Sequence, residues 1–199
     1  MPTFEEVKQQ QYAKHLLPKG ARVLLGQKNL CVDLGCYRSK TPGYVGFDCA
    51  PGADADFFCD LNDGIPLEDE CCASVVAGHF LEHVADPEFM AHEIWRVCQD
   101  GAKVRINVPA VSWDAVFVIE HRHVIAEAFF TLNRCFKALF AIDRLYYQCD
   151  PVALETARKY LPDITEEDAG LLLTNVRRQL LVEAHPLHKR KETPSEVVP

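Results

Sequence analysis

The segment NLCVDLGC, residues 29–36, followed by GYVGFD at residues 43–48, is the part of the sequence most informative about the fold. Each part is a short apolar run that meets an acidic residue and a glycine near its end. The sequence predicts five such strands, at Asn29–Leu34, Tyr44–Phe47, Ala55–Cys59, Ala73–Ala77 and Lys103–Val108. They are nearly continuous hydrophobic runs, which is typical of parallel strands covered by helices on both faces. The pattern therefore indicates an α/β fold.

A helix is expected between the fourth and fifth strands, over Asp86–Cys98. Asp86 can cap it and Pro87 occupies its first position. We expect Asp100-Gly101 to end this helix and to turn the chain into the fifth strand, which makes the two strands parallel neighbours. By contrast, the connection Gly35–Gly43 between the first two strands leaves room for at most one or two helical turns.

The remaining segments alternate between helical and extended patterns. The sequence predicts an opening helix to about Leu17, a helix over Val124–Ala138, a strand over Phe140–Gln148, a helix from Asp150 through Tyr160 and a strand over Val176–Ala184. Thr3 and Glu6 form a capping box for the first of these helices. We expect one domain over residues 1–184 and a polar, flexible tail over residues 185–199.

Composition narrows the class of protein. The chain has 199 residues, of which 48% are hydrophobic, enough for one globular core. Its net charge of -8 disfavours nucleic-acid partners, and no apolar run approaches the ~18 residues that cross a bilayer, so a cytoplasmic location is expected. The nine cysteines are irregularly spaced and include no Cys-x-x-Cys pair, which argues against disulfides and a zinc site. We expect no metal site.

The ends of the first two strands favour an adenosine-containing cofactor. A glycine after the acidic strand end lets the backbone approach a nucleotide-like ligand, and Asp48 at the next strand end suits a ribose diol. A single glycine turn is weak support when taken alone. The full G-x-G-x-x-G fingerprint is absent, which disfavours a dinucleotide-binding dehydrogenase.

The order of these motifs resembles the class I S-adenosylmethionine-dependent methyltransferases, especially the small-molecule branch called type 11. The resemblance covers about Leu30–Pro109, and HFLEHV at residues 79–84, followed by Asp-Pro and a helix, is its most distinctive part. It implies a doubly wound, Rossmann-like, mostly parallel sheet with a final antiparallel strand and helices on both faces. It also implies S-adenosyl-L-methionine as cofactor and a small-molecule acceptor as substrate.

Carried over position by position, the resemblance implies a set of cofactor contacts. These are Asp33, Gly35, Cys36, Tyr37, Asp48, Asp60, Leu61 and His79. Asp33 would lie near the methionine amino group, and Gly35 would let the chain pass beneath the cofactor. Asp48 would accept hydrogen bonds from the ribose, Asp60 would meet the adenine amino group, and His79 would stand by the transferable methyl.

Tyr37 is a departure from the family pattern, which usually has a second glycine at this position. Ser39 replaces the next small or glycine position. The tyrosine ring could crowd the methionine moiety of the cofactor. Alternatively it could swing out as a lid, which the short loop Lys40–Gly43 makes plausible.

Histidines are the candidates for a general base, because their unperturbed pKa lies near neutrality. We predict a catalytic role for His121, His123 or His79; the alternative for the first two is an exposed loop position. His83, beside Glu82, is more readily interpreted as a structural hydrogen-bonding residue.

Four aromatic residues, Trp113, Phe117, Phe129 and Phe130, fall where the family has its substrate lid. They could stack on an acceptor, although packing in the core is the simpler interpretation for the two adjacent phenylalanines.

Three functions remain open from the sequence. The first is methyl transfer to a small molecule, such as a sugar, a lipid-linked compound or a secondary metabolite. The second is a non-catalytic binding module in which Tyr37 blocks the cofactor. The third, a nicotinamide-dependent oxidoreductase, is disfavoured by the glycine pattern.

Overall fold

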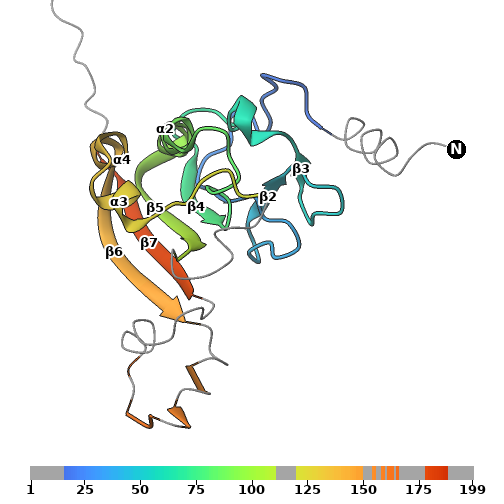
Figure 1. The fold of residues 1–199 in the computed structure, drawn as a ribbon. Coiled ribbons are helices and arrows are strands. Elements are labelled where there is room, and N and C mark those ends of the chain that lie inside the picture. The colour runs from blue at the N-terminus through green and yellow to red at the C-terminus, as the bar shows by residue number, and fades with distance from the viewer. Residues whose placement is uncertain are drawn as a thin grey trace, which may run out of the picture.

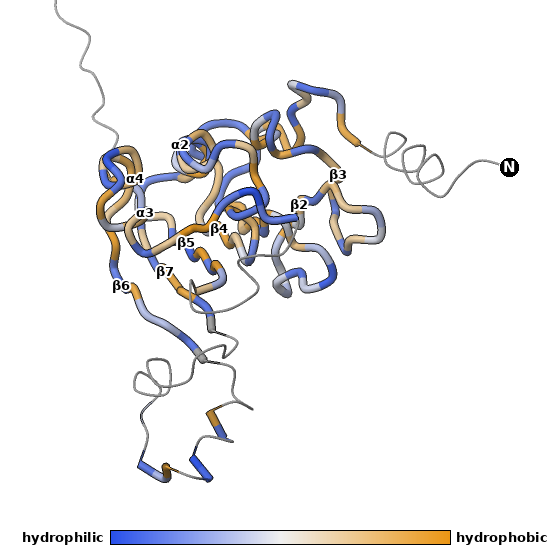
Figure 2. Tube along the Cα trace, in the orientation of Figure 1, coloured by the Kyte–Doolittle hydropathy of each residue, from blue (hydrophilic) through white to orange (hydrophobic). Residues whose placement is uncertain are grey.

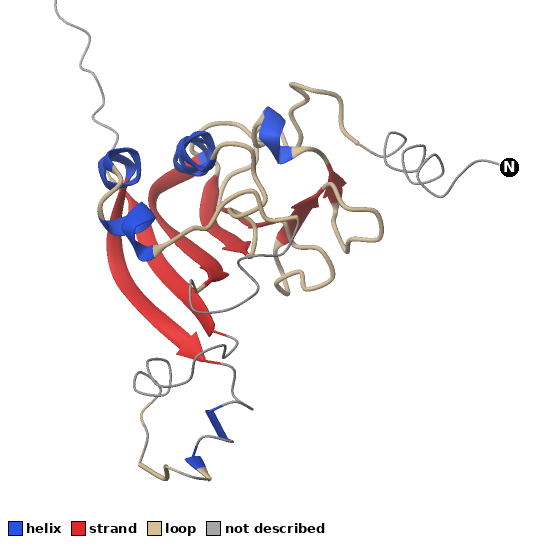
Figure 3. Ribbon diagram, viewed as in Figure 1, coloured by secondary structure: helices blue, strands red, loops and turns tan. Residues whose placement is uncertain are grey.

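A computed structural model describes residues 16–110, 120–149, 154–155, 158–159, 161–163, 165 and 178–187. The elements in chain order are β1 (Leu30–Leu34), β2 (Val45–Asp48), β3 (Phe57–Phe58), the 3-10 helix η1 (Leu61–Asp63), β4 (Cys72–Gly78), α2 (Pro87–Val97), β5 (Cys98–Pro109), α3 (Glu127–Thr131), α4 (Arg134–Leu139), β6 (Phe140–Cys149) and β7 (Arg178–Pro186). The strands form a seven-stranded sheet in the order β3-β2-β1-β4-β5-β7-β6 (Figures 1 and 3).

The sheet is mostly parallel, as the sequence predicts. β1 pairs in parallel with β2 and β4, β2 with β3, and β4 with β5. β7 is the antiparallel strand and lies between β5 and β6. The structure thus confirms a Rossmann-like sheet with a final antiparallel strand. β7 runs to Pro186, so the strand passes the boundary expected at residue 184.

Helix α2 follows the predicted capping pattern. The Asp86 carboxylate accepts hydrogen bonds from the backbone N–H groups of Glu88 and Phe89, at 2.9 and 3.0 Å, and Pro87 takes the first position. These bonds satisfy N–H groups that have no partner within the helix. The predicted helix is therefore confirmed to within a residue at each end.

The predicted end of that helix needs a correction. The helix ends at Val97 and β5 already begins at Cys98, so Asp100-Gly101 lies inside the strand. The pairing of β4 with β5 is irregular there, because Cys72 faces Cys98 but Ser74 faces Lys103. Gly101 has a φ of 72°, which glycine adopts without a steric penalty, and it allows a bulge within the strand instead of a helix stop.

The hydrophobic core lies between the sheet and the helices α2, α3 and α4. The amphipathic helix α2 buries Met90, Ile94 and Val97. In Figure 2, orange marks the hydrophobic stretches of the strands and helices. Phe136 of α4 lies 5.2 Å from the ring of Phe130 and 4.8 Å from that of Phe140. Phe130 is fully buried, so the core interpretation of this aromatic residue is confirmed.

The two faces of β5 differ in burial. Val104 and Ile106 are buried, whereas Lys103 and Arg105 are exposed, so the described helices cover one face of this strand. The alternation shows that β5 is not the continuous hydrophobic run that the sequence analysis describes. The predicted opening helix and Trp113 and Phe117 lie outside the described residues, as does most of the predicted helix from Asp150 through Tyr160.

Two predicted elements are shorter than expected. The helix predicted over Val124–Ala138 is two short helices, because Asn133 interrupts it and caps α4 by accepting a hydrogen bond from the N–H of Phe136 at 3.0 Å. Asn is favoured at this position because its side-chain oxygen replaces a missing backbone acceptor.

The strand predicted over Ala55–Cys59 is reduced to β3.

The connection between β1 and β2 contains turns and no helix. The buried Asp33 carboxylate accepts a hydrogen bond from the N–H of Thr41 at 2.6 Å, and the Tyr44 hydroxyl lies 3.0 Å from the Ser74 hydroxyl. Lys40 binds Asp56 at 3.1 Å. These contacts hold the loop close to the strands and shape the space beyond their ends.

Candidate active site

A cavity of about 930 Å³ lies at the carboxyl ends of β1, β2, β3 and β4. In open α/β sheets, ligands bind at this edge where the strand order reverses, which here is between β1 and β4. Seven of the eight residues predicted to contact the cofactor line the cavity: Gly35, Cys36, Tyr37, Asp48, Asp60, Leu61 and His79. Residues far apart in the sequence therefore surround one space.

Asp33 is the predicted contact that does not line the cavity. Its side chain is only 3% exposed, and its carboxylate is engaged by the backbone of Thr41. In this structure Asp33 anchors the loop that follows β1.

Gly35 is required by two features of the turn that follows β1. Its φ is 67°, in the left-handed region that favours glycine, and a Cβ atom there would lie 2.6 Å from Cδ2 of Phe80. Phe80 itself lines the cavity and is 8% exposed. The absence of a side chain at Gly35 thus lets the loops after β1 and β4 meet, and leaves backbone at the cavity wall.

Asp48 organises the loops at the end of β2. One carboxylate oxygen accepts the N–H of Tyr37 at 2.8 Å, and the other accepts the N–H of Ala50 at 2.6 Å. Each oxygen keeps a second lone pair, so the carboxylate can accept a further hydrogen bond from a ligand.

Asp60 plays a similar part at the end of β3. It caps η1 by accepting the backbone N–H of Asn62 at 3.0 Å, and Asn62 in turn accepts the N–H of Ala85 at 2.7 Å. The loops after β3 and β4 are thereby joined along the cavity wall.

Tyr37 does line the cavity, but its side chain is 48% exposed. The guanidinium carbon of Arg38 lies 5.2 Å from the centre of its ring, within the range of a cation–π contact. The residue has a φ of 39°, an uncommon value for a residue with a side chain. Its exposure favours the swung-out arrangement over crowding of the cavity.

A cluster of polar side chains forms the wall after β4. His79 has a φ of 52°, and its Nδ1 lies 3.2 Å from the Glu82 carboxylate, which is only 1% exposed. Strained backbone of this kind is concentrated at functional sites. His83 and Glu120 also line the cavity, with Nδ1 of His83 3.2 Å from the Glu120 carbonyl oxygen.

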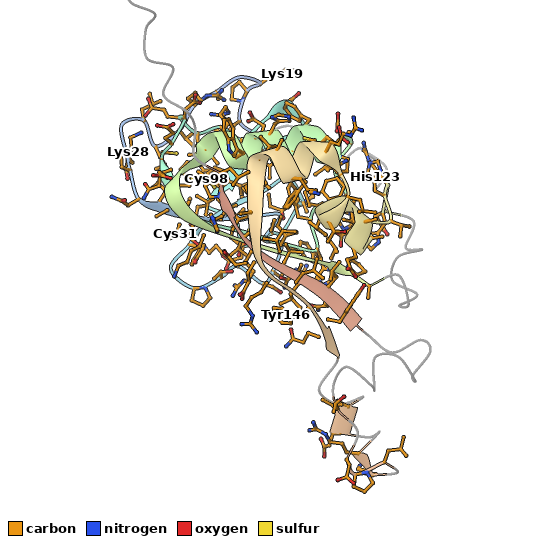
Figure 4. All side chains as sticks on the ribbon, turned by 90° about the vertical axis from the view of Figure 1, so that its left-hand side faces the viewer. Lys19, Lys28, Cys31, Cys98, His123 and Tyr146 are labelled. Atoms are coloured by element: carbon orange, nitrogen blue, oxygen red, sulfur yellow. The ribbon has the colours of Figure 1, made fainter. Side chains whose placement is uncertain are left out.

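Neither His121 nor His123 lines the cavity, although both lie beside this cluster. The His121 ring packs edge-on against that of His83, with 4.6 Å between centres, and Nε2 of His123 lies 3.2 Å from the carbonyl oxygen of Ala85. Burial lowers the pKa of His121, and the neighbouring His83 lowers it further. In Figure 4, His123 lies at the opposite end of the molecule from Lys28 and Cys31.

Two thiols belong to the same wall. Burial raises the pKa of both Cys36 and Cys59 to about 12, and nearby carboxylates such as Asp48 add to the effect. The thiols therefore stay protonated near neutral pH and act as small apolar groups.

Several lining residues were not among the predicted contacts, including Phe80, Val84 and Glu120. Phe80 and Val84 belong to the distinctive HFLEHV segment, whose position after a strand was a usable signal. Glu120 had no such signal, because only the fold brings it to the cavity. None of the described helices is both long and apolar enough for a membrane span.

Similar solved structures share the architecture. One is from Haloferax volcanii, a complex of the Trm112 methyltransferase activator with a methyltransferase. The alignment covers 92% of this chain and 92% of that one, at 17% identity and a TM-score of 0.54. An S-adenosylmethionine-dependent methyltransferase from Mesorhizobium loti gives 18% identity, a TM-score of 0.52 and coverage of 85% of this chain and 93% of that one.

A third neighbour was solved with the cofactor. It is phosphoethanolamine N-methyltransferase 2 of Haemonchus contortus in complex with S-adenosyl-L-methionine, at 12% identity and a TM-score of 0.53, covering 81% of this chain and 49% of that one. At these identities the likeness shows the fold. No curated protein sequence matches the chain.

The strand order and the position of the cavity at the strand ends are those of the class I S-adenosylmethionine-dependent methyltransferase fold. Within that class, residues 49–106 match the type 11 family model, described as "Methyltransferase domain". The matched segment runs from the residue after β2 into β5 and includes the loops after β3 and β4 that line the cavity.

Proposed function

We propose that the protein transfers the methyl group of S-adenosylmethionine to a small-molecule acceptor bound in the cavity beyond β1 and β4. The observation that carries this proposal is the convergence of seven predicted cofactor contacts on one cavity. A volume of about 930 Å³ is at the upper end of the range for small-molecule sites, enough for a cofactor and a small acceptor. The net charge of -8 disfavours a nucleic-acid acceptor.

The ribose and methionine parts of the cofactor would bind beside Gly35 and Asp48. Because Phe80 packs against Gly35 where a Cβ would lie, the loop after β1 presents backbone and no side chain to the ligand at this position. The free lone pairs of the Asp48 carboxylate would accept the two ribose hydroxyls. Cys36 and the swung-out Tyr37 would complete this part of the wall.

The adenine would bind at the other side of this cavity. Asp60 would accept a hydrogen bond from the adenine amino group, and Leu61, which is 4% exposed, would pack against the ring. The cap that Asp60 forms on η1 fixes its position before the ligand arrives.

The methyl group would face His79. Of the three histidines proposed as a base, His79 is the one that lines the cavity, and Glu82 holds its ring through Nδ1. Transfer from a sulfonium needs alignment and exclusion of water more than a fixed catalytic triad. His79 would therefore position the acceptor and take up its proton where the acceptor has one.

Calorimetry with S-adenosylhomocysteine tests the cofactor site. We expect micromolar binding to the wild type and at least a tenfold loss in Asp48→Asn, because hydrogen bonds to a charged carboxylate contribute about 1.5–3 kcal/mol each. Asp54→Asn is the matched control, since its side chain is 74% exposed and does not line the cavity. Absence of heat with the folded wild type would instead favour the non-catalytic binding module.

We also propose a cytoplasmic location. The described cysteines are free thiols, several of them buried, which suits a reducing compartment. Fractionation of cells that express the full chain tests this, and recovery of the protein outside the cytoplasm would contradict it.

A further inference from the structure

A cluster of three potential metal ligands lies behind the wall formed by the loop after β4. One ligand atom from each of Glu82, His83 and His121 lies within 4.8 Å of the other two. Around a tetrahedral ion with bonds near 2.1 Å, ligand atoms are about 3.4 Å apart. Each atom would have to move by only about 1 Å to reach that geometry, which small side-chain rotations provide.

Two of the three residues in this cluster each have a buried polar atom that lacks a hydrogen-bond partner among the described residues. Glu82 is 1% exposed, and while one carboxylate oxygen faces His79, the other is buried without a hydrogen bond. Nδ1 of His121 is likewise buried without one. An unsatisfied buried polar atom costs about 1–3 kcal/mol, so two of them in neighbouring residues of one cluster favour a ligand site here.

The backbone holds the cluster together before any ligand binds. The carbonyl oxygen of Glu82 accepts the N–H groups of Arg122 and His123 at 2.7 and 3.1 Å. The Glu120 carbonyl lies 3.2 Å from Nδ1 of His83. A histidine that donates one ring N–H to a carbonyl presents its other nitrogen to a metal, which is the usual support of metal-bound histidine.

From this geometry we propose that Glu82, His83 and His121 bind a divalent first-row transition-metal ion such as Zn²⁺. Two imidazoles and one carboxylate suit Zn²⁺, Co²⁺ or Fe²⁺, whereas Mg²⁺ and Ca²⁺ prefer oxygen ligands alone. The expectation of no metal site is drawn from cysteine spacing, and no cysteine takes part in this cluster. The ligands here come from two segments that only the fold brings together.

The position of this site favours a role for the ion in binding the methyl acceptor, and this role rests on the proposed function. His83 and Glu120 line the cavity, so the ion would lie at its wall. Three protein ligands leave a coordination position open. An oxygen of the methyl acceptor can occupy that position, so the acceptor class would be an alcohol, phenol or carboxylate.

Metal titration of the full chain tests the site. After treatment with a chelator, the wild type should bind one Co²⁺ or Zn²⁺ per chain in calorimetry. His121→Ala and His83→Ala should each weaken this binding by more than the roughly 10- to 100-fold that outer-shell changes cost. His92→Ala is the matched control, because this exposed histidine on α2 is outside the cluster and should leave the affinity unchanged.

X-ray absorption of the zinc-loaded wild type supplies a readout that needs no variant. Two imidazoles and one carboxylate in the first shell support the site. A shell of water alone, no stoichiometric binding, or equal binding by His121→Ala and wild type overturns it.

S-adenosylhomocysteine binding separates this inference from the proposed function. Because His121 does not line the cavity, His121→Ala should keep its cofactor affinity while it loses the metal. Metal binding without cofactor binding in the wild type would refute the proposed function and leave the metal site standing. Cofactor binding without metal binding would refute the metal site alone.

Discussion

Arg96 of α2 connects this helix to residues Ile65–Asp69, which follow η1. Its replacement by methionine should destabilise the protein markedly. Its guanidinium donates to both carboxylate oxygens of Glu93, at 2.7 and 2.8 Å. It also donates to the carbonyl oxygens of Ile65 and Leu67, each at 2.8 Å. A fifth bond, to Asp69 at 2.8 Å, involves a carboxylate that is 71% exposed and should contribute little.

The size of the effect follows from burial. The side chains of Arg96 and Glu93 are only 19% and 14% exposed. In Arg96→Met the Glu93 carboxylate keeps the N–H of Ile65, at 2.7 Å, but loses its counter-charge. Removing one partner of a buried ion pair costs about 3–5 kcal/mol, and access of water to this pair places the loss near the lower value. A loss of about 3 kcal/mol lowers Tm by about 6–12 °C in a chain of this size.

Urea unfolding followed by circular dichroism measures the loss. Arg134→Met is the matched control, because this exposed arginine should change the unfolding free energy by less than about 0.5 kcal/mol. The double variant Arg96→Met with Glu93→Gln should lose less than the sum of the two single losses, since the residues share one network. A loss below about 1 kcal/mol in Arg96→Met would show that the pairing of Arg96 with Glu93 contributes little to stability.

The same pair predicts a pH dependence. Burial alone would raise the pKa of Glu93, but the hydrogen bonds from Arg96 and from the N–H of Ile65 lower it overall. A carboxyl whose pKa is lowered by folding stabilises the protein above its unfolded pKa, near 4.3, and loses this contribution as pH falls through the folded pKa. The stability difference between wild type and Arg96→Met should therefore shrink below about pH 4.

Three further experiments, two with variants and one with the wild type, test other parts of the structure. Gly35→Ala should abolish cofactor binding in calorimetry, because its Cβ would meet Phe80 at 2.6 Å and its φ is positive. Phe136→Ala should cost about 3–5 kcal/mol in urea unfolding, because the side chain is 1% exposed in an aromatic cluster. Cys36 and Cys59, with pKa values raised to about 12 by burial, should resist iodoacetamide at pH 8 in the native protein and react in urea, as mass spectrometry can report.

Each of these tests has a control. Gly43→Ala has a similar backbone conformation with nothing within 4 Å, so it should keep cofactor binding if the clash is the cause. Phe89→Ala removes a ring that is 41% exposed and should cost under about 1 kcal/mol. Alkylation of Cys36 in the native protein at a rate equal to that in urea would contradict the assigned pKa.

The strands of the sheet could be predicted because the residues that identify each strand lie within a few positions of one another. Apolar runs such as Asn29–Leu34 are too short for helices and too hydrophobic for loops, and Asp86-Pro87 marks a helix start by chemistry that acts over a few residues. The acidic residues and glycines lie directly at the strand ends, so a cofactor site at one edge of the sheet could also be predicted. The break at Asn133 was missed although the cap that causes it is also local, whereas the bulge at Gly101 depends on how β5 pairs with β4.

Local sequence patterns were therefore enough to predict the strands along the chain, the capped helix α2, and the residues from Gly35 to His79 that follow the strand ends. The three-dimensional fold was needed to show that Asp33 binds the Thr41 N–H and does not line the cavity, that Tyr37 is half exposed, and that Glu82, His83 and His121 lie together. The physical reason is that hydrogen bonds from the backbone of residues 122 and 123 to the Glu82 carbonyl join two segments far apart in sequence. No periodicity or spacing within either segment encodes that contact.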